Sequence, residues 1–600
     1  MAKSPGFILF ILFVVAVVLV IASPALSSMF FKDSDKEGMV DTVYADYDDS
    51  TVPEYGGIHN RIRTSNWEVW DYAIPPYMVD ISLMGEELLG GDWTKGPAGT
   101  NENDWTSGYG GFTDTLTGRL AEDWEMPDSE TIIYHIRQGI HWWDKEPANG
   151  RELTAEDVAW NIERHFTSPR SLHYNAYNKT GKSPLSITAT DRYTVEVKVD
   201  PQWQGLMAAV IGDHMWMLCP DAVEANGGEP LASWQQFIGT GPFMIDNYVK
   251  DTYIEFVRNP DYWQTDPLNP ENRLPYADGI KDTIIHYAIL DSGSPYAHQA
   301  GLIKAAFKFG RVDFISTLTK VLTWEEVDEL KAEFTALGVK PFAGSTATFL
   351  WPRLDNTELP FNDIRIRRAM NLAVNKQELV DDYYYGHADL LVWPYPDLPV
   401  FDRIYTPLEE QSQAVQDLFG YDIERARELM AEAGYPDGFE FTIYSDKSEF
   451  LMIIKEYLKD IDIDMKIRYA IELAGMDTSD EQAFYGDANL LKPQDMASVI
   501  EGSPFNYSRI NDPRIQQAYM SVSRYTGIND SEVARILKEI GPYILEQAVP
   551  VFFPTPQSFV MWWPWLQNYY GAVGGGGNDN IDEYLMYFWI DTDMKTAMGY

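Results

Sequence analysis

Carboxylates and large aromatic side chains are the residues of this sequence with the widest chemical scope. Among its 600 residues are 91 acidic residues, 19 Trp and 36 Tyr. Two facing carboxylates beside aromatic rings can hydrolyse a glycosidic bond, and carboxylates can also bind a cationic ligand. With so many carboxylates such pairs arise by chance, so composition alone does not favour a hydrolase.

The short motifs that mark common catalytic and metal sites are absent from the sequence. It contains no G-x-S-x-G, no H-E-x-x-H and no phosphate-binding G-x-x-x-x-G-K-[ST]. Its nine His are scattered, with His135 expected on a strand and His141 six positions further on. The single cysteine, Cys219, can form neither an intramolecular disulfide nor a thiolate metal site. We therefore predict no enzyme activity, no metal and no cofactor; a metal would need ligands assembled from distant parts of the chain.

The formal net charge of -45 limits the classes of partner. A field of this sign repels nucleic acid and anionic lipid, so neither is predicted as a partner. Solubility is the favoured interpretation of the charge, with a cationic ligand as the alternative. Hydrophobic residues make up 45% of the chain, which is enough for a packed core.

An apolar run close to the N-terminus indicates export. Phe7–Ala22 follows Lys3, and charge returns only at Lys32. The run is near the lower limit of about 17–25 residues for crossing a bilayer, so it is either a signal peptide or a short uncleaved anchor. Ala25 and Ser27 permit cleavage, and no lipoprotein cysteine follows.

These features predict two segments ahead of the folded body. Residues 1–30 are a signal peptide or membrane anchor, expected as an apolar helix standing clear of the rest. Residues 31–57 are an acidic tether. No later segment is apolar enough to span a membrane, so the remainder is expected outside it.

Helix and strand patterns alternate along the rest of the chain, which indicates an α/β fold. Thr194–Val199 alternates polar and apolar residues, as in a half-buried strand. Helices are predicted to begin after Thr154, Asp363 and Asp422, each of which precedes apolar residues at helical spacing. Further strands are predicted at Tyr253–Val257 and Phe439–Tyr444.

Five segments resemble, in their order along the chain, those of a known family. They are Leu120–Glu125 with Gly139–Asp144, Leu153–Val158, Gly239–Phe243 with Arg258–Trp263, Asn362–Lys376, and Ala431–Phe439. Each is weak alone. Together, over roughly residues 60–560, the chain resembles the family 5 extracellular solute-binding proteins, which include the dipeptide, oligopeptide and nickel binders of ABC importers. Lys145–Glu152 is longer than the family's link, so the loop there is altered.

The resemblance implies an α/β, two-lobed, periplasmic-binding-protein-like (type II) fold with an extra subdomain on lobe one. Lobe one is expected over 58–280, with the subdomain at about 90–215, and again over 555–600. Lobe two is expected over 285–550. We expect the two crossings at Lys281–Leu290 and Pro550–Pro554, since both are extended apolar stretches.

The resemblance also implies a function. It predicts an exported protein, periplasmic or on the cell surface, that closes on a peptide or other small solute and delivers it to ABC permease subunits. Uncleaved, its N-terminal segment would hold it to the membrane. The main alternative is a cell-surface structural protein that retains the binding fold without transport. A hydrolase would need a facing carboxylate pair in the cleft.

Candidate ligand-binding residues follow from the same resemblance. Peptide binders of the family commonly hold the ligand amine with an Asp in a G-x-D-Y or A-D-Y segment, which Tyr485–Ala488 matches best, so Asp487 is a candidate. Lys492–Asp495 stands where a D-P pair is expected, and a surface-loop aspartate is the competing interpretation. Trp142 and Trp143 are adjacent and would point oppositely in an extended segment, one to the cleft and one to the core.

Overall fold

The computed structural model describes most of the chain after residue 51. The described residues are 52–63, 66–67, 69–74, 82–96, 112–228, 230–285, 297–315, 322–342, 346–397, 401–445, 449–469, 482–489, 496–503, 505–571 and 584–600. They all belong to one compact unit, 48–600. The predicted signal or anchor helix over 1–30 lies outside them. No helix in these ranges is long and apolar enough to cross a membrane.

The largest hydrophobic core, core one, is made by buried residues between Trp67 and Leu337 and between Val560 and Ile590. One sheet has the order β1-β10-β9-β8, and a second, antiparallel sheet has the order β4-β5-β7-β6. The strands are β1 Ile58–Arg63, β2 Leu89–Gly91, β3 Leu116–Gly118, β4 Ala121–Asp128, β5 Thr131–Ile136, β6 Ser186–Asp191, β7 Thr194–Lys198, β8 Phe243–Val249, β9 Tyr253–Arg258, β10 Gly279–Ile284 and β11 Phe314–Ile315. The helices are α3 Ala155–Thr167, α4 Gln204–Asp213, α5 Pro220–Ala225, α6 Ala297–Lys308, α7 Trp324–Glu333 and α15 Thr592–Ala597.

Two further cores share residues 347–553. Core two is packed from Ala347 to Phe552 and also takes in Phe112, and core three from Leu350 to Phe553. Between them lies the sheet β13-β17-β15-β16. The strands are β13 Thr346–Pro352, β14 Ala388–Asp389, β15 Phe439–Ser445, β16 Ile463–Tyr469 and β17 Ala483–Asn489. The helices are α8 Ile364–Ala373, α9 Lys376–Glu378, α10 Gln413–Phe419, α11 Ile423–Glu432, α12 Glu449–Lys459, α13 Pro513–Tyr525 and α14 Asp530–Glu546.

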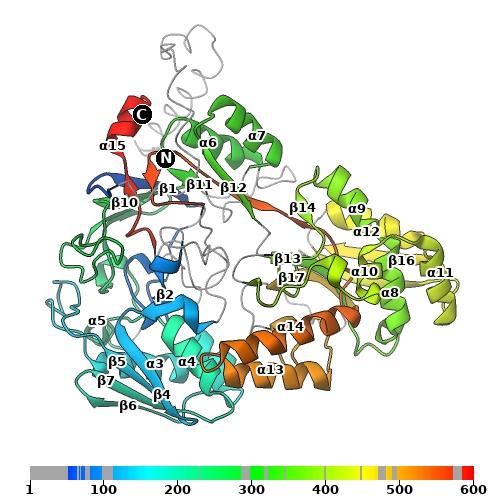
Figure 1. Cartoon of the computed structure of the whole chain (residues 1–600), viewed down its shortest axis with the longest axis horizontal. Helices are drawn as coiled ribbons and strands as arrows, with labels where there is room; N and C mark the ends of the chain where they lie inside the picture. The colour runs from blue at the N-terminus through cyan, green and yellow to red at the C-terminus, as the bar shows by residue number, and fades with distance from the viewer. Residues whose placement is uncertain are drawn as a thin grey trace, which may run out of the picture. The chain divides into compact units, whose positions relative to one another are not determined.

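Two connections between core one and the other cores run side by side. The chain leaves core one through β12 (Gly338–Phe342) and returns through β18 (Thr555–Pro556) and β19 (Ser558–Trp562). β12 and β19 are antiparallel, with Phe342 opposite Ser558, and β11 pairs with β19 on its other edge. Figure 1 shows these strands between core one and the sheet that carries β13 and β17.

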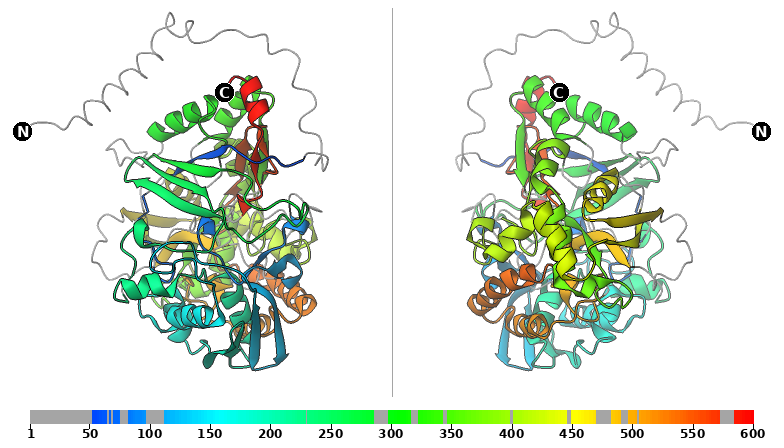
Figure 2. Two further views of the ribbon diagram at one scale, coloured as in Figure 1. Left: turned by 90° about the vertical axis from the view of Figure 1, so that its left-hand side faces the viewer. Right: turned by 90° about the vertical axis from the view of Figure 1, so that its right-hand side faces the viewer.

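Most locally predicted elements are confirmed. Thr154, Asp363 and Asp422 each directly precede a helix, and the backbone N–H of Thr154 donates to Asp157 Oδ2 at 2.9 Å. The strands expected near 194, 253 and 439 are β7, β9 and β15. The C-terminus packs on core one as well: the Tyr600 hydroxyl donates to the Lys308 carbonyl, so α15 lies beside α6 (Figure 2).

The first predicted crossing begins inside a sheet. Lys281 lies in β10, opposite Asn60 of β1 and Glu255 of β9, and residues 281–283 are paired on both sides. Residues 286–290 of that crossing lie outside the described ranges. The division into lobes, with its boundaries, stays a prediction.

Candidate functional site

Asp487 lies near the end of strand β17, at the end of the sheet where the chain enters from β12. β13 starts at Thr346, shortly after β12 ends at Phe342. β17 runs antiparallel to β13, which puts Asp487 opposite Thr348 and Asn489 opposite Thr346. The backbone of Asp487 is therefore close in sequence register to the point where the chain passes from β12 into β13.

The loop interpretation of Asp487 is corrected by the backbone. The residue is part of β17, within a ladder of seven residue pairs to β13. Single-sequence pattern missed the strand because Gly486 and Asp487 interrupt its apolar residues, and both types are rare in strands. The side chain of Asp487 is not among those described, so its contact with a ligand stays a prediction.

Aromatic rings pack against β17 on its core-two side. The Trp351 indole is fully buried and donates from Nε1 to the Gly486 carbonyl at 3.0 Å. Trp393 meets it edge to face, with ring centroids 5.8 Å apart. Phe484 stacks on Tyr507 at 4.1 Å. Sequence reasoning did not single out these rings, which fix the backbone on both sides of Gly486, next to the candidate aspartate.

The returning connection is held to the same sheet by hydrogen bonds. The backbone N–H of Val551 donates to the Leu350 carbonyl at 2.8 Å. The Asn371 amide accepts from the Phe552 N–H at 2.9 Å and donates to the Pro550 carbonyl at 3.0 Å. The segment Pro550–Phe552, which includes most of the second predicted crossing, is thus anchored to cores two and three.

A second set of contacts joins the two sides just beyond that anchor. Trp324 of α7 stacks on His387 with centroids 4.0 Å apart and planes 7° from parallel. Gln557 accepts from Trp324 Nε1 through its carbonyl at 3.3 Å and donates its side-chain amide to Asp389 at 2.9 Å. Burial raises the pKa of Asp389. Gln557 of the returning connection is therefore held both by Trp324 of α7 and by Asp389 of β14.

Trp142 and Trp143 both lie in core one, 1% and 4% exposed. Trp142 Nε1 faces Asp157 Oδ2 at 3.5 Å, and the Trp143 ring packs on Phe237 at 5.5 Å. Their burial favours a core position for both indoles over the predicted cleft position for one. The altered loop folds back here, since the Trp142 backbone N–H donates to the Arg151 carbonyl. The structure does not group these indoles with Asp487, and a ligand contact of either stays a prediction.

Residues 112–114, which lead into β3, contact residues of the chain beyond 400, and the Phe112 ring is itself buried in core two. The Thr113 backbone N–H and hydroxyl donate to Asp530 Oδ2 at 2.8 and 2.7 Å. Arg403 pairs with Asp114 at 2.9 Å and lies over the Phe112 ring at 4.3 Å. This set, here called the Thr113–Asp530 clasp, joins segments far apart in the sequence.

Helices α4 and α13 continue this contact, as Figure 1 shows. Gln202 donates its side-chain amide to the Met520 carbonyl at 2.7 Å, and Lys182 donates to the Tyr519 hydroxyl at 3.1 Å. Gly205 lies so close to Thr526 that a Cβ on Gly205 would be 2.0 Å from the Thr526 carbonyl oxygen. The backbones of α4 and of the C-terminal end of α13 are therefore in direct contact.

A small pocket remains beside this contact. It has a volume of about 20 Å³ and is lined by Leu89, Thr113, Leu116, Trp124, Ala208, Ala209, Asp213, Thr526 and Gly527. That is room for about one water molecule. The cores are thus in contact here with no space for a peptide-sized solute.

The arginines at the start of α8 hold the chain around them in place. Arg365 pairs with Asp363, and the buried Arg367 donates to the carbonyls of Phe361 and Ala548. No cluster of three or more potential His, Cys, Asp or Glu metal ligands occurs within the described ranges.

Comparison with known proteins gives one family match and many similar chains. The model for "Bacterial extracellular solute-binding proteins, family 5 Middle" matches residues 115–509. Heme-binding protein A of Haemophilus influenzae is 27% identical over 55% of this chain, and the dipeptide-binding protein of Escherichia coli is 25% identical over 56%. The matches span 56% and 58% of those relatives' own length.

Solved structures are similar over more of the chain. The periplasmic binding protein DppA from Helicobacter pylori, in complex with the peptide STSA, is 22% identical and covers 90% of this chain and 99% of its own, with a TM-score of 0.65. HbpA2 from Haemophilus parasuis is 19% identical, covers 86% of this chain and 98% of its own, and has a TM-score of 0.64. These likenesses confirm the predicted α/β periplasmic-binding-protein fold.

Proposed function

The chain belongs to the family 5 bacterial extracellular solute-binding proteins, and on that premise we propose that it captures a peptide or similar small zwitterion and presents it to an ABC importer. The side-by-side connections carry this proposal. They are the links through which β12 and β19 join core one to cores two and three. Two adjacent links permit a hinge motion while keeping the facing surfaces in register.

We place the lobes by their cores. Lobe one comprises core one, including α6, α7 and β12, and lobe two comprises cores two and three, from about residue 346 to 553. This sets the first crossing later than the sequence-based 281–290, because Phe307, Val327 and Leu337 pack in core one. The antiparallel sheet β4-β5-β7-β6 with α3 forms the extra subdomain of lobe one.

Closure supplies the binding mechanism. A ligand that contacts both lobes lowers the free energy of the closed state only, and so shifts the population toward it. The Thr113–Asp530 clasp and the α4–α13 contact add protein–protein interactions in the same state. The importer's permease subunits then recognise the closed form.

Peptides are the proposed ligand class. Relatives named for dipeptides and the neighbour crystallised with STSA support it. The strand position of Asp487 near the connections suits an ion pair with a ligand amine. The charge of -45 also favours a ligand with a cationic end, since it raises the local concentration of cations. We propose that the protein acts outside the cytoplasm, exported by the segment over 1–30.

Calorimetric titration of an Asp487→Asn variant tests the proposal. A dipeptide that binds the parent should bind the variant more weakly by about 1.5–3 kcal/mol, the range for hydrogen bonds to charged groups. The N-acetylated dipeptide, which lacks the cationic amine, should bind both proteins weakly and equally. Asp464→Asn, on β16 of the same sheet, is the matched control and should leave both affinities unchanged. Equal affinity of parent and variant for every peptide would remove Asp487 from the site.

A further inference from the structure

A pocket of about 450 Å³ opens on the extra subdomain, away from the connections between the cores. Helix α3 provides one wall through Trp160, Glu163, Arg164 and Thr167, whose spacing places them on one helix face. Ser168 and Arg170 follow in the turn after α3. The opposite wall is made by Ile74, Val223, Glu224, Gly228 and Pro230. The volume of the pocket is in the usual range of about 300–1,000 Å³ for small-molecule sites.

An ion pair and its hydrogen bonds lie beside Trp160 in this pocket. Arg164 donates from both terminal nitrogens to the two oxygens of the fully buried Asp71, at 2.8 and 2.5 Å. Asp71 is itself held by the Ala73 N–H at 3.1 Å. The Arg164 guanidinium also lies over the Trp160 ring at 5.5 Å. Arg164 is therefore neutralised and fixed, and the indole beside it is oriented.

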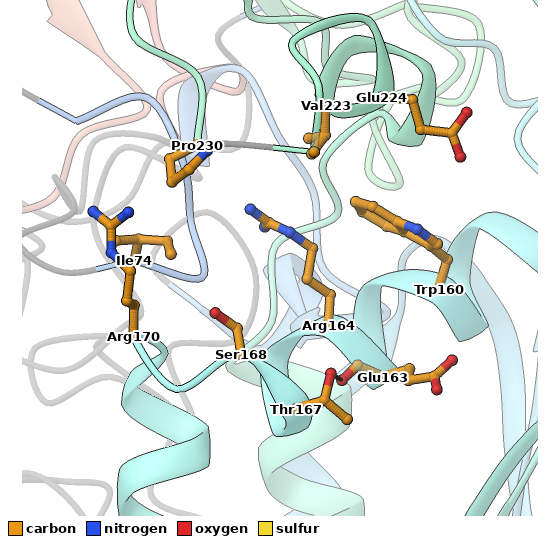
Figure 3. Close-up of a pocket in the computed structure, with 11 residues that line it drawn as sticks. Ile74, Trp160, Glu163, Arg164, Thr167, Ser168, Arg170, Val223, Glu224 and Pro230 are labelled. Carbon is orange, nitrogen blue, oxygen red and sulfur yellow. Dashed lines mark hydrogen bonds between the residues drawn. The ribbon is translucent and has the colours of Figure 1, made fainter.

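Three donors in the pocket are left for a ligand. Across the described ranges, Arg170 takes part in no ion pair, and neither the Ser168 hydroxyl nor Trp160 Nε1 in a hydrogen bond. Figure 3 shows the Glu163 and Glu224 carboxylates directed past Trp160, away from Arg164 and Arg170. With Arg164 balanced by Asp71, Arg170 is left as the guanidinium of the pocket lining that has no ion-pair partner among the described residues.

Apolar surface completes the site. Ile74 and Val223 are almost fully buried yet line the pocket, and Pro230 and the Trp160 ring extend the same surface. The Arg170 guanidinium and the Ser168 hydroxyl, which lie on the same side of Arg164 in Figure 3, match a carboxylate attached to an apolar group that packs on these walls. We propose that this pocket is a second ligand site, for small organic carboxylates, that acts independently of the peptide site between the lobes.

Ligand-observed NMR titration of the full chain tests this, with benzoate as the probe and benzyl alcohol as its uncharged match. Benzoate should bind with a dissociation constant on the order of 1 mM, as expected for a ligand of its size. Arg170→Gln should weaken benzoate at least about fivefold and leave benzyl alcohol unchanged, since only the carboxylate loses its partner. Arg311→Gln makes the same change of net charge on an exposed turn after α6 and should alter neither affinity.

Two results would overturn the second site. Benzoate binding equally to the parent and to Arg170→Gln would mean that the carboxylate is bound elsewhere. Displacement of benzoate by a saturating dipeptide would place it in the peptide site. The proposed function is separable, because peptide affinity should be the same for the parent and Arg170→Gln whatever the benzoate result.

Discussion

Thr113 and Asp530 are 417 positions apart in the sequence and share a two-donor contact, in which the backbone N–H and hydroxyl of Thr113 both reach Asp530 Oδ2. The Asp114 N–H approaches the same oxygen at 3.3 Å. Asp530 is the first residue of α14, and α14 packs in core two. A single carboxylate oxygen thus ties two separately packed parts of the protein together.

We predict that Asp530→Ala favours separation of the two parts. The two hydrogen bonds that Asp530 accepts form only in the closed state, so their loss destabilises that state alone. Peptide affinity should therefore fall by about 1–2 kcal/mol, or roughly five- to thirtyfold. Calorimetric titration measures the change. Glu532→Ala also removes a carboxylate from the first turn of α14. Glu532 pairs with Arg535 of the same helix, so this variant should change peptide affinity less than twofold by the same measurement. An equal loss in both variants would trace the effect to the helix rather than to the clasp.

Gly205→Ala should hinder closure sterically. The added Cβ would meet the Thr526 carbonyl at 2.0 Å, so α4 and α13 must move apart. We expect weaker peptide binding and a larger radius of gyration by small-angle X-ray scattering with saturating peptide. Gly301→Ala is the matched control, since nothing lies within 4 Å of its Cβ position on α6. That substitution should raise stability by about 0.5–1 kcal/mol through helix propensity and leave binding unchanged. An unaltered scattering profile for Gly205→Ala would contradict the contact.

Lys376 should make stability depend on pH. It is 1% exposed, its Nζ donates to the Asn371 carbonyl at 2.6 Å, and burial lowers its pKa to about 7. In the unfolded chain the pKa is about 10.4. Between these values the unfolded state binds the extra proton, so the free energy of unfolding should rise with pH by up to about 1.4 kcal/mol per pH unit from this group.

Lys376→Met removes that dependence. The variant should be stabilised relative to the parent most at pH 6, where the buried ammonium is charged, and progressively less toward pH 9.5. Urea unfolding at both pH values measures the difference. The exposed Lys459→Met should show the same small effect at each. A stabilisation of Lys376→Met that does not change with pH would show that the ammonium is not desolvated in the folded protein.

Local elements could be predicted from the sequence because their signals are local. Thr154 with Asp157, and Asp363 and Asp422, mark helix starts through bonds to backbone groups within three residues. The alternating valines of β7 likewise indicate a strand that is buried on one face only. Such patterns do not depend on what lies far away in the chain.

The site depends on distant pairings that single-sequence patterns do not encode. The surface-loop interpretation competed with the ligand-binding interpretation of Asp487 because Gly486 and Asp487 carry no strand signal, yet the structure pairs both residues with β13. The Thr113–Asp530 clasp has no motif at either end. Trp142 and Trp143 were expected on opposite sides of an extended segment, but the loop ahead of Glu152 folds back and both indoles pack in core one.

Mass spectrometry of the small molecules released when the natively purified protein is denatured tests the central claim most directly. A solute-binding protein with tight closure retains ligand through purification when its dissociation constant is micromolar or tighter, on the order of 8 kcal/mol. We expect peptides, released in an amount comparable with the protein and absent from preparations of Asp487→Asn. A protein that releases no small molecule, binds no peptide in titration and instead assembles into an ordered lattice would contradict the account and favour a cell-surface structural role.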